Sequence, residues 1–244
     1  MKNQVTQAFE QGPREYQEDF FVTKYFDTDL FRGWLLAVMD GHGGDKVAKL
    51  CAKEICNLFI PQKNLELSLR DICSKLNELT KNFVEGSTLS IVLVDENKSI
   101  AHVAVIGDSP VVIYDGKNFN VSPEHNVRTN LNERELATQR GGTYFGGYLY
   151  DKEKNYGLQM SRALGDTYLS SILSREPEIY YVSNPQWLLV SSDGLFDPGH
   201  ENTKKLIEEI KKHAMKNSNA KDLIEWAKTR GLNDNATVVV WSLK

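Results

Sequence analysis

The sequence places a carboxylate and an imidazole in a glycine-rich turn directly after an apolar segment. The turn DGHGG (residues 40–44) follows the run WLLAVM (residues 34–39), which is typical of a buried strand, and precedes a helical pattern. Its glycines permit a tight turn and leave the backbone carbonyls accessible. Such oxygens suit Mg²⁺ or Mn²⁺, so Asp40 and the Gly41 carbonyl could bind an ion, with His42 beside it as an acid or base. On this segment alone, a strand-to-helix turn with a capping aspartate and a solvated histidine is an alternative.

Three more aspartates lie where strands are expected to end or begin. Asp108 and Asp193 each follow a predicted strand, and Asp234 precedes one. Converging carboxylates repel one another and are costly to desolvate, and divalent cations remove both penalties. One such aspartate is usually a turn residue, but four of them beside core strands favour a shared metal site.

Apolar patterns predict the strands and helices that must position these residues. The expected strands cover residues 4–10, 20–22, 34–39, 88–94, 99–106, 110–114, 178–182, 186–191 and 236–241. The expected helices cover about 44–60, 65–83, 131–139, 203–215 and 220–229. This order suggests a largely antiparallel sheet system with paired helices outside it, an α+β fold in which residues 1–244 form a single domain.

The composition is that of an ordinary globular protein and excludes several function classes. With 41% hydrophobic residues, 25% charged residues and a net charge of −4, the chain offers no basic cluster for nucleic acid. No apolar run approaches the roughly 20 residues that span a bilayer, and the first residues lack a secretory signal. Cys51, Cys56 and Cys73 lack paired or zinc-ligand spacing and fit buried thiols of a reducing compartment. We therefore expect a cytoplasmic protein with neither a nucleic-acid nor a membrane partner.

Seven short motifs follow one another along the chain. They are RxxxED (14–19), DGHGG (40–44), GST (86–88), GDS (107–109), SRALGD (161–166), SDGLFD (192–197) and DNAT (234–237). Their content and order resemble the PP2C-type (PPM) family of metal-dependent protein serine/threonine phosphatases. Each motif alone is a weak signal, but seven in the family's order, across residues 14–237, are specific.

The resemblance implies a fold and a metal centre. The fold would be a four-layer αββα arrangement, an antiparallel β-sandwich flanked by pairs of helices, with two Mg²⁺ or Mn²⁺ ions in a cleft at one end. Asp40 resembles the carboxylate that bridges the two ions, and Asp193 and Asp234 resemble the other ligands of the first. Glu18, through water, and the Gly41 carbonyl resemble ligands of the second.

The resemblance also implies a weaker third ion and two side chains that act on the substrate. Asp108 and Asp197 resemble ligands of the third ion, which they share with Asp193. Arg14 resembles the arginine that binds the substrate phosphate, and His42 resembles the general acid.

The chemistry of these side chains fits the implied reaction. A metal pair lowers the pKa of a bridging water, and the resulting hydroxide attacks phosphorus in line without a phosphoenzyme intermediate. Arg14 is planar and always charged, so it can hold two phosphate oxygens. His42 can protonate the leaving serine or threonine oxygen at physiological pH. We thus expect a monomer that hydrolyses phosphoserine and phosphothreonine monoesters in the protein substrates of a serine/threonine kinase.

Other polar residues are interpreted without a catalytic role. Arg162 and Asp166 are expected to be structural, with Arg162 paired to carboxylates, and His125 is expected in a loop or on the surface. Pro110 stands where the family commonly has arginine, which affects local recognition rather than catalysis. The short segment 167–176 occupies the position at which we expect a flap beside the active site.

Three other functions are weaker interpretations of the sequence. The segment DTD (27–29) resembles the motif of aspartate-nucleophile phosphatases of the haloacid dehalogenase class, but Phe31 stands where threonine or valine belongs. A cysteine phosphatase needs an arginine six positions after its cysteine, and positions 57, 62 and 79 hold Asn, Gln and Leu. A catalytically silent scaffold protein would lack metal ligands, and all of them are present here.

Overall fold

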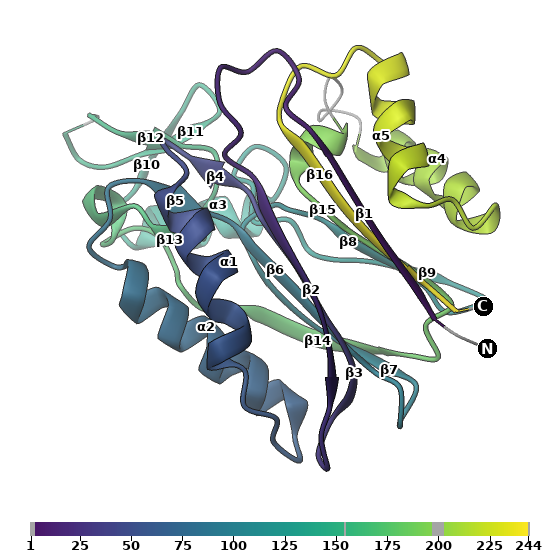
Figure 1. Cartoon of the computed structure of the whole chain (residues 1–244). Helices are drawn as coiled ribbons and strands as arrows, with labels where there is room; N and C mark the ends of the chain where they lie inside the picture. The colour runs from purple at the N-terminus through teal and green to yellow at the C-terminus, as the bar shows by residue number, and fades with distance from the viewer. Residues whose placement is uncertain (1–2, 154, 197–202, 244) are drawn as a thin grey trace.

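Two five-stranded sheets face each other between pairs of helices in the computed structural model of the chain, which describes residues 3–153, 155–196 and 203–243 (Figure 1). The first sheet has the order β14-β7-β6-β3-β2: Glu178–Ser183, Ile100–Ile106, Leu89–Asp95, Arg32–Met39 and Phe20–Asp27. The second has the order β1-β16-β15-β8-β9: Gln4–Glu10, Ala236–Ser242, Trp187–Ser191, Val111–Tyr114 and Phe119–Val121. Within both sheets, neighbouring strands pair antiparallel.

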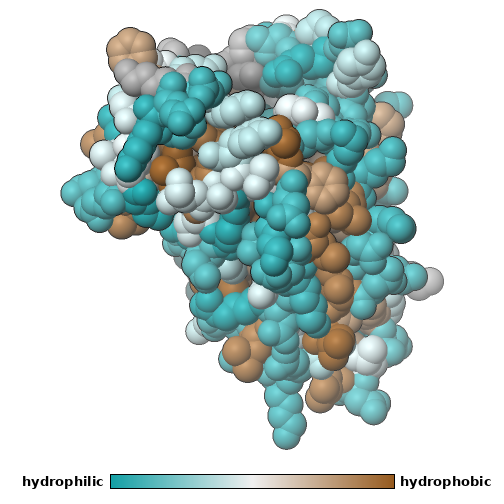
Figure 2. All heavy atoms as spheres, turned by 90° about the vertical axis from the view of Figure 1, so that its left-hand side faces the viewer, coloured by the Kyte–Doolittle hydropathy of each residue, from teal (hydrophilic) through white to brown (hydrophobic). Residues whose placement is uncertain are grey.

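Helices cover the outer face of each sheet. Helices α1 (Lys46–Leu58) and α2 (Leu65–Thr80) contact the first sheet, and α4 (Thr203–Met215) and α5 (Ala220–Thr229) share a core with the second. The predicted four-layer αββα fold is therefore confirmed. Within the described residues, no helix combines the length and the apolar character that crossing a bilayer requires. Figure 2 shows one face of the molecule as largely hydrophilic, with a strip of hydrophobic residues along it.

Strand β3 shows why its sequence is an uninterrupted apolar run. Leu35, Ala37 and Met39 point into the core beneath α1 and α2, whereas Leu36 and Val38 point into the core between the two sheets. Successive side chains of a strand face opposite sides, so a strand in a covered sheet must be apolar on both. Fully burying each of these larger side chains contributes about 1.5–3 kcal/mol. The strand that carries Asp40 is thereby anchored on both of its faces.

Short elements gather at one end of the sandwich. They are the helix α3 (Leu131–Gln139) and the small sheets β13-β5-β4 (Leu164–Gly165, Gly86–Ser87, Gly41–His42) and β10-β11-β12 (Thr143–Phe145, Tyr148–Tyr150, Gly157–Leu158). These strands are two or three residues long, too short for an apolar period to predict them. They surround the end at which the predicted site residues lie (Figure 1).

Candidate active site

The strand order brings the predicted acids to a single end of the sandwich. Strands β3 and β7 both pair antiparallel with β6, so they run in the same direction and Asp40 and Asp108 follow them at the same edge. In the second sheet β15 pairs antiparallel with β16, which puts Asp193 after the end of one strand and Asp234 before the start of the other. Strand β2 begins where β3 ends, so Glu18 lies close to Asp40.

A cleft of about 390 Å³ opens at this end. The predicted site residues that line it are Arg14, Glu18, Asp40, Gly41, His42, Asp108, Asp193 and Asp234. The other predicted ligand, Asp197, lies outside the described residues. The rest of the lining includes Arg128, which precedes α3. It also includes Tyr148 and residues 157–160, from the region of β11 and β12. This small sheet occupies the position beside the cleft that we expected for residues 167–176, none of which lines it.

The carboxyls of the cleft act on one another electrostatically. Burial raises the pKa of Asp40 well above its ordinary value, and the charges of Asp19, Asp193, Asp108 and Asp234 raise it further. A bound divalent cation would favour the ionised carboxylates and offset this repulsion. The available donors are oxygens, the set that Mg²⁺ and Mn²⁺ prefer. Among the described residues, no three acidic, histidine or cysteine side chains already have the geometry of a metal site, so the fit to a cation rests on charge and donor chemistry.

Protein groups contact two of the predicted ligands directly. Arg14, which is about half exposed, places Nη2 2.6 Å from Oδ2 of Asp234. The side-chain amide of Asn126 donates to Oδ2 of Asp108 over 2.8 Å. The predicted phosphate-binding arginine is therefore held at the mouth of the cleft by one of the acids beside it. The amide of Asn126 is a partner of Asp108 that the sequence motifs did not indicate.

Asp19 is not among the residues that line this cleft. Its side chain is buried and accepts a hydrogen bond of 2.7 Å from the hydroxyl of Ser192. Burial raises the pKa of Asp19 to about 6, in spite of this hydrogen bond. Asp19 thus belongs to the same electrostatic cluster as Asp40.

Two buried hydroxyls support the turn that carries Asp40. The backbone N–H of Asp40 donates to Oγ1 of Thr88 over 3.0 Å, and the N–H of Thr88 donates back to the Asp40 carbonyl over 2.9 Å. The hydroxyls of Thr88 and Ser109 lie 2.6 Å apart. The motifs GST and GDS, which supply these two residues, therefore connect the turn after β3 to the turn after β7. The sequence motifs did not indicate this connection.

Asn235 fixes the loop that carries Arg14 and Glu18. Its side-chain oxygen accepts the backbone N–H of Glu18 over 2.8 Å, and its amide nitrogen donates to the carbonyls of Gln11 and Tyr16. The adjacent backbone also requires glycine at position 194, where a Cβ would lie 1.8 Å from the Asn235 carbonyl oxygen. The motifs RxxxED (14–19) and DNAT (234–237), which are far apart in the sequence, are thus packed together at the start of β16.

The imidazole of His42 contacts Asp166 at the edge of the cleft. Its Nε2 lies 2.9 Å and 3.1 Å from the two carboxylate oxygens of Asp166. Nδ1 of the same ring is buried and has no hydrogen-bond partner among the described residues. The sequence indicated a structural role for Asp166 and did not predict this contact.

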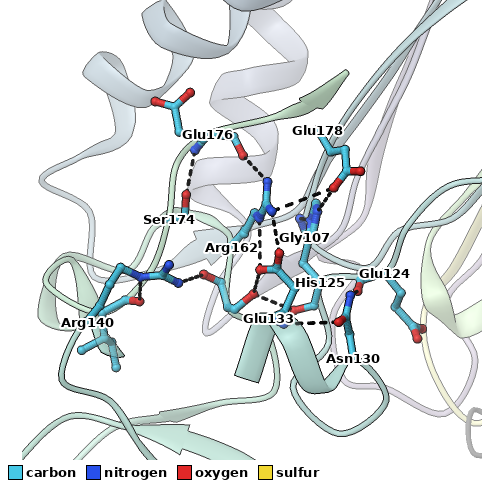
Figure 3. A network of polar contacts seen from close by, with 12 residues as sticks. Gly107, Glu124, His125, Asn130, Glu133, Arg140, Arg162, Ser174, Glu176 and Glu178 are labelled. Atoms are coloured by element: carbon cyan, nitrogen blue, oxygen red, sulfur yellow. Dashed lines mark hydrogen bonds and ion pairs between the residues drawn. The ribbon is translucent and has the colours of Figure 1, made fainter. Parts of the chain in front are cut away.

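A network of polar contacts includes His125, Glu133 and Arg162 (Figure 3). His125 lies in a loop of this network, as the sequence suggested, but it is fully buried, so the alternative of a surface position is wrong. Its Nδ1 accepts the backbone N–H of Gly107 over 3.1 Å, next to Asp108. Burial lowers the pKa of His125, and the charge of Arg162 lowers it further. A neutral imidazole that accepts at Nδ1 therefore supports the turn after β7.

A buried ion pair connects this network to α3. Nη2 of Arg162 lies 2.5 Å from Oε1 of Glu133, and the Glu133 side chain is 4% exposed (Figure 3). Burial alone would raise the pKa of Glu133, but hydrogen bonds from Arg162 and Ser161 lower it below its ordinary value. The predicted structural role of Arg162 as a partner of carboxylates agrees with these contacts.

Comparisons with known proteins agree with this geometry. A sequence model of the family described as Protein phosphatase 2C matches residues 32–236. The chain is 25% identical over 250 residues to Protein phosphatase 2C homolog 1 of Schizosaccharomyces pombe, covering 94% of this chain and 70% of the relative. Among solved structures, serine-threonine phosphatase 2C from Toxoplasma gondii is similar with a TM-score of 0.74 and 18% identity, over 98% of this chain and 94% of that one. The catalytic domain of the phosphatase PstP, in complex with 2 manganese ions, is similar with a TM-score of 0.67 and 21% identity, over 98% and 97%. At these identities the solved structures show the fold alone.

Proposed function

Because the chain belongs to the protein phosphatase 2C family, we propose that it hydrolyses phosphoserine and phosphothreonine monoesters in proteins with the help of divalent cations. One observation carries this proposal. A single cleft gathers an arginine, a histidine and carboxylates from both sheets of the sandwich. This combination can bind a phosphate dianion only if cations offset the charge of the acids.

Two Mg²⁺ or Mn²⁺ ions are the proposed cofactors, with a weaker third. Asp40 would contact both ions of the pair, Asp193 and Asp234 would complete the first, and Glu18 and the Gly41 carbonyl would serve the second. When bound, such ions supply a water of lowered pKa as the nucleophile and polarise the phosphate. The catalytic domain of PstP is in complex with two manganese ions, which supports the proposal of two ions here.

We assign Asp108 to the third ion, together with Asp193, which would also bind the first ion of the pair. Asp197 would join them, although it lies outside the described residues. The side-chain amide of Asn126 donates a hydrogen bond to the Asp108 carboxylate and so fixes its orientation.

Arg14 and His42 act on the substrate itself. The Arg14 guanidinium lies at the cleft mouth and can exchange its contact with Asp234 for two phosphate oxygens. His42 lines the same cleft and would donate a proton to the leaving serine or threonine oxygen as its bond to phosphorus breaks. The proposed reaction transfers the phosphoryl group directly to water, so it needs no nucleophilic side chain and forms no phosphoenzyme.

We also propose that residues 1–244 act as one catalytic domain and as a cytoplasmic monomer whose substrates are phosphorylated by a serine/threonine kinase. The continuous core between the two sheets supports a single domain, because side chains from β3 and β16 pack in the same cluster. Gel filtration with light scattering would test the monomer.

The decisive experiment measures phosphate release from phosphoserine and phosphothreonine peptides with Mn²⁺, with Mg²⁺ and after chelation. We expect turnover with either metal, little after chelation, and loss of nearly all activity in Asp193→Asn. Asp27→Asn is the control. Asp27 is exposed at the end of β2 and does not line the cleft, so its substitution should leave turnover unchanged.

The same pair of variants separates the rival functions. An aspartate-nucleophile phosphatase that used the segment 27–29 would lose activity in Asp27→Asn and keep it in Asp193→Asn. A silent scaffold protein would release no phosphate from any peptide with either metal. Full turnover after exhaustive chelation would overturn the metal-dependent mechanism.

A further inference from the structure

The contact between His42 and Asp166 is sheltered and involves both carboxylate oxygens. The Asp166 side chain is 9% exposed and that of His42 is 24% exposed. Asp166 does not line the cleft, whereas His42 does. The carboxylate therefore lies behind the imidazole, where it can act on a bound substrate only through the ring.

Three chain segments are paired to make this contact. In the small sheet β13-β5-β4, His42 and Gly165 both lie opposite Gly86, and Asp166 follows at the end of β13. A Cβ on Gly86 would lie 2.0 Å from Oδ2 of Asp166 and 2.2 Å from Nε2 of His42. Glycine at position 86 is thus required by the side-chain contact itself. The motifs DGHGG, GST and SRALGD meet at this point.

The backbone of Asp166 is held in an unfavourable conformation. Its φ is +50°, in the left-handed region, which typically costs a non-glycine residue about 1 kcal/mol or more. Its N–H donates to the Glu85 carbonyl over 3.0 Å, and Glu85 is tied in turn to Lys46 by its side chain. Glycine would relieve the strain but would remove the carboxylate. Backbone strain of this kind is concentrated at functional sites, and here the strained residue carries the group that contacts His42.

We propose that Asp166 is a positioning residue that holds the imidazole of His42 in the orientation for protonating the leaving oxygen. This inference rests on the proposed function, because it requires His42 to be the general acid. Both oxygens of Asp166 lie against Nε2, and this contact fixes the orientation of the ring beside the cleft. During the step the oxygen of the attacking water bonds to phosphorus while the P–O bond to the serine or threonine breaks. The electron pair of the broken bond stays on the departing oxygen, and a proton passes from the imidazole of His42 to that oxygen.

The test uses variants that fit the backbone. Asp166→Gly and Asp166→Asn both suit a positive φ, so neither should disrupt the turn. General acid catalysis is typically worth ~10²–10⁴-fold, and misorientation of the acid should forfeit part of it. For Asp166→Gly we expect about a 10–100-fold lower kcat on a phosphoserine peptide, within that range. On p-nitrophenyl phosphate, whose leaving group departs unaided, kcat should fall less than about threefold. Asp166→Asn keeps an acceptor for the Nε2 proton and should recover much of the loss.

A double-mutant cycle separates positioning from a general structural effect. If Asp166 acts only through His42, adding Asp166→Gly to His42→Ala should cause no further loss on either substrate. Glu85→Gln is the matched control, since it alters the carboxyl of the residue that precedes β5, whose side chain contacts Lys46 rather than His42. Its effect should be equal on the two substrates. The KM of the peptide and the affinity for Mn²⁺ should stay unchanged in the Asp166 variants.

The outcomes distinguish this inference from the proposed function. If the wild-type chain releases no phosphate from either substrate, the proposed function fails. If the wild type is active but Asp166→Gly loses activity equally on both substrates, or loses more in the His42→Ala background, the positioning role is refuted and the phosphatase function stands.

Discussion

Thr88 offers a sharp test of how the chain holds the turn that carries Asp40. Its side chain is buried, with 1% of its surface exposed, and its hydroxyl contacts the Asp40 N–H and the Ser109 hydroxyl. Thr88→Val replaces the hydroxyl with a methyl group of similar size. The Asp40 N–H then loses its acceptor, and the Ser109 hydroxyl loses its partner.

The expected loss of stability follows from these two contacts. Leaving one buried polar group unsatisfied costs about 1–3 kcal/mol, so two such groups should lower the free energy of unfolding by about 2–6 kcal/mol. For a chain of this size each kcal/mol shifts Tm by about 2–4 °C. Urea unfolding in the presence of a chelator measures the effect without the added stability that a bound metal gives.

Thr80→Val is the matched control for this measurement. Thr80 is also fully buried, but its hydroxyl bonds to a carbonyl of its own helix, α2, at Leu76. Its replacement should cost less than about 1 kcal/mol, because the helix carbonyl keeps a backbone partner. In the Thr88→Val background, Ser109→Ala should add little, since its hydroxyl has already lost its partner. Equal losses in Thr88→Val and Thr80→Val would show that the hydroxyl of Thr88 does not support the Asp40 turn.

Two further predictions concern pH. The pKa of Asp19 is about 3.8 in the unfolded chain and is raised to about 6 in the folded chain. The stability that protonated Asp19 contributes is therefore fully present below pH 3.8 and is lost as the pH rises through about 6. In chelator, the unfolding free energy of wild type minus that of Asp19→Asn should therefore fall by about 2–3 kcal/mol between pH 4 and pH 7, and a flat difference would contradict the electrostatic cluster. The pKa of Glu133 is lower in the folded chain than its unfolded value near 4.5. The stability that ionised Glu133 contributes is therefore present above pH 4.5 and is lost as the pH falls through the pKa of the folded state. Glu133→Gln should cost about 3 kcal/mol at pH 7, because it leaves the largely buried Arg162 with only its longer ion pair with Glu178, at 3.9 Å, and this penalty should shrink below about pH 4.5 in urea unfolding.

Much of the fold could be predicted from the sequence because its core elements are long and strongly patterned. The boundaries expected for β1, α3, α4 and α5 match the structure, and the remaining long strands differ by one or two residues at an end, apart from β2. Strand β2 was expected to end at Val22, and it continues to Asp27 through partly buried and exposed side chains that do not form an apolar run. The helix expected over 65–83 ends at Thr80, where the Phe83 N–H bonds to the Thr80 carbonyl and closes a turn.

The sequence by itself determined which residue types form the candidate site. Every motif except GST contains a carboxylate, and such local chemistry can be recognised without a structure. The order of the motifs was sufficient for the resemblance, and the described residues that were predicted as ligands line one cleft.

Only the tertiary structure decided which side chains support these residues. The contacts of Asp166 with His42, of Asn126 with Asp108 and of Thr88 with Ser109 join positions between 18 and 124 residues apart. No period or spacing encodes such pairs, because they depend on strand register and on the room that glycine at position 86 leaves for the side chains of His42 and Asp166. The burial of His125 has the same origin. A single polar residue in a loop carries no local signal of its environment, and packing against the turn after β7 determines that it is buried.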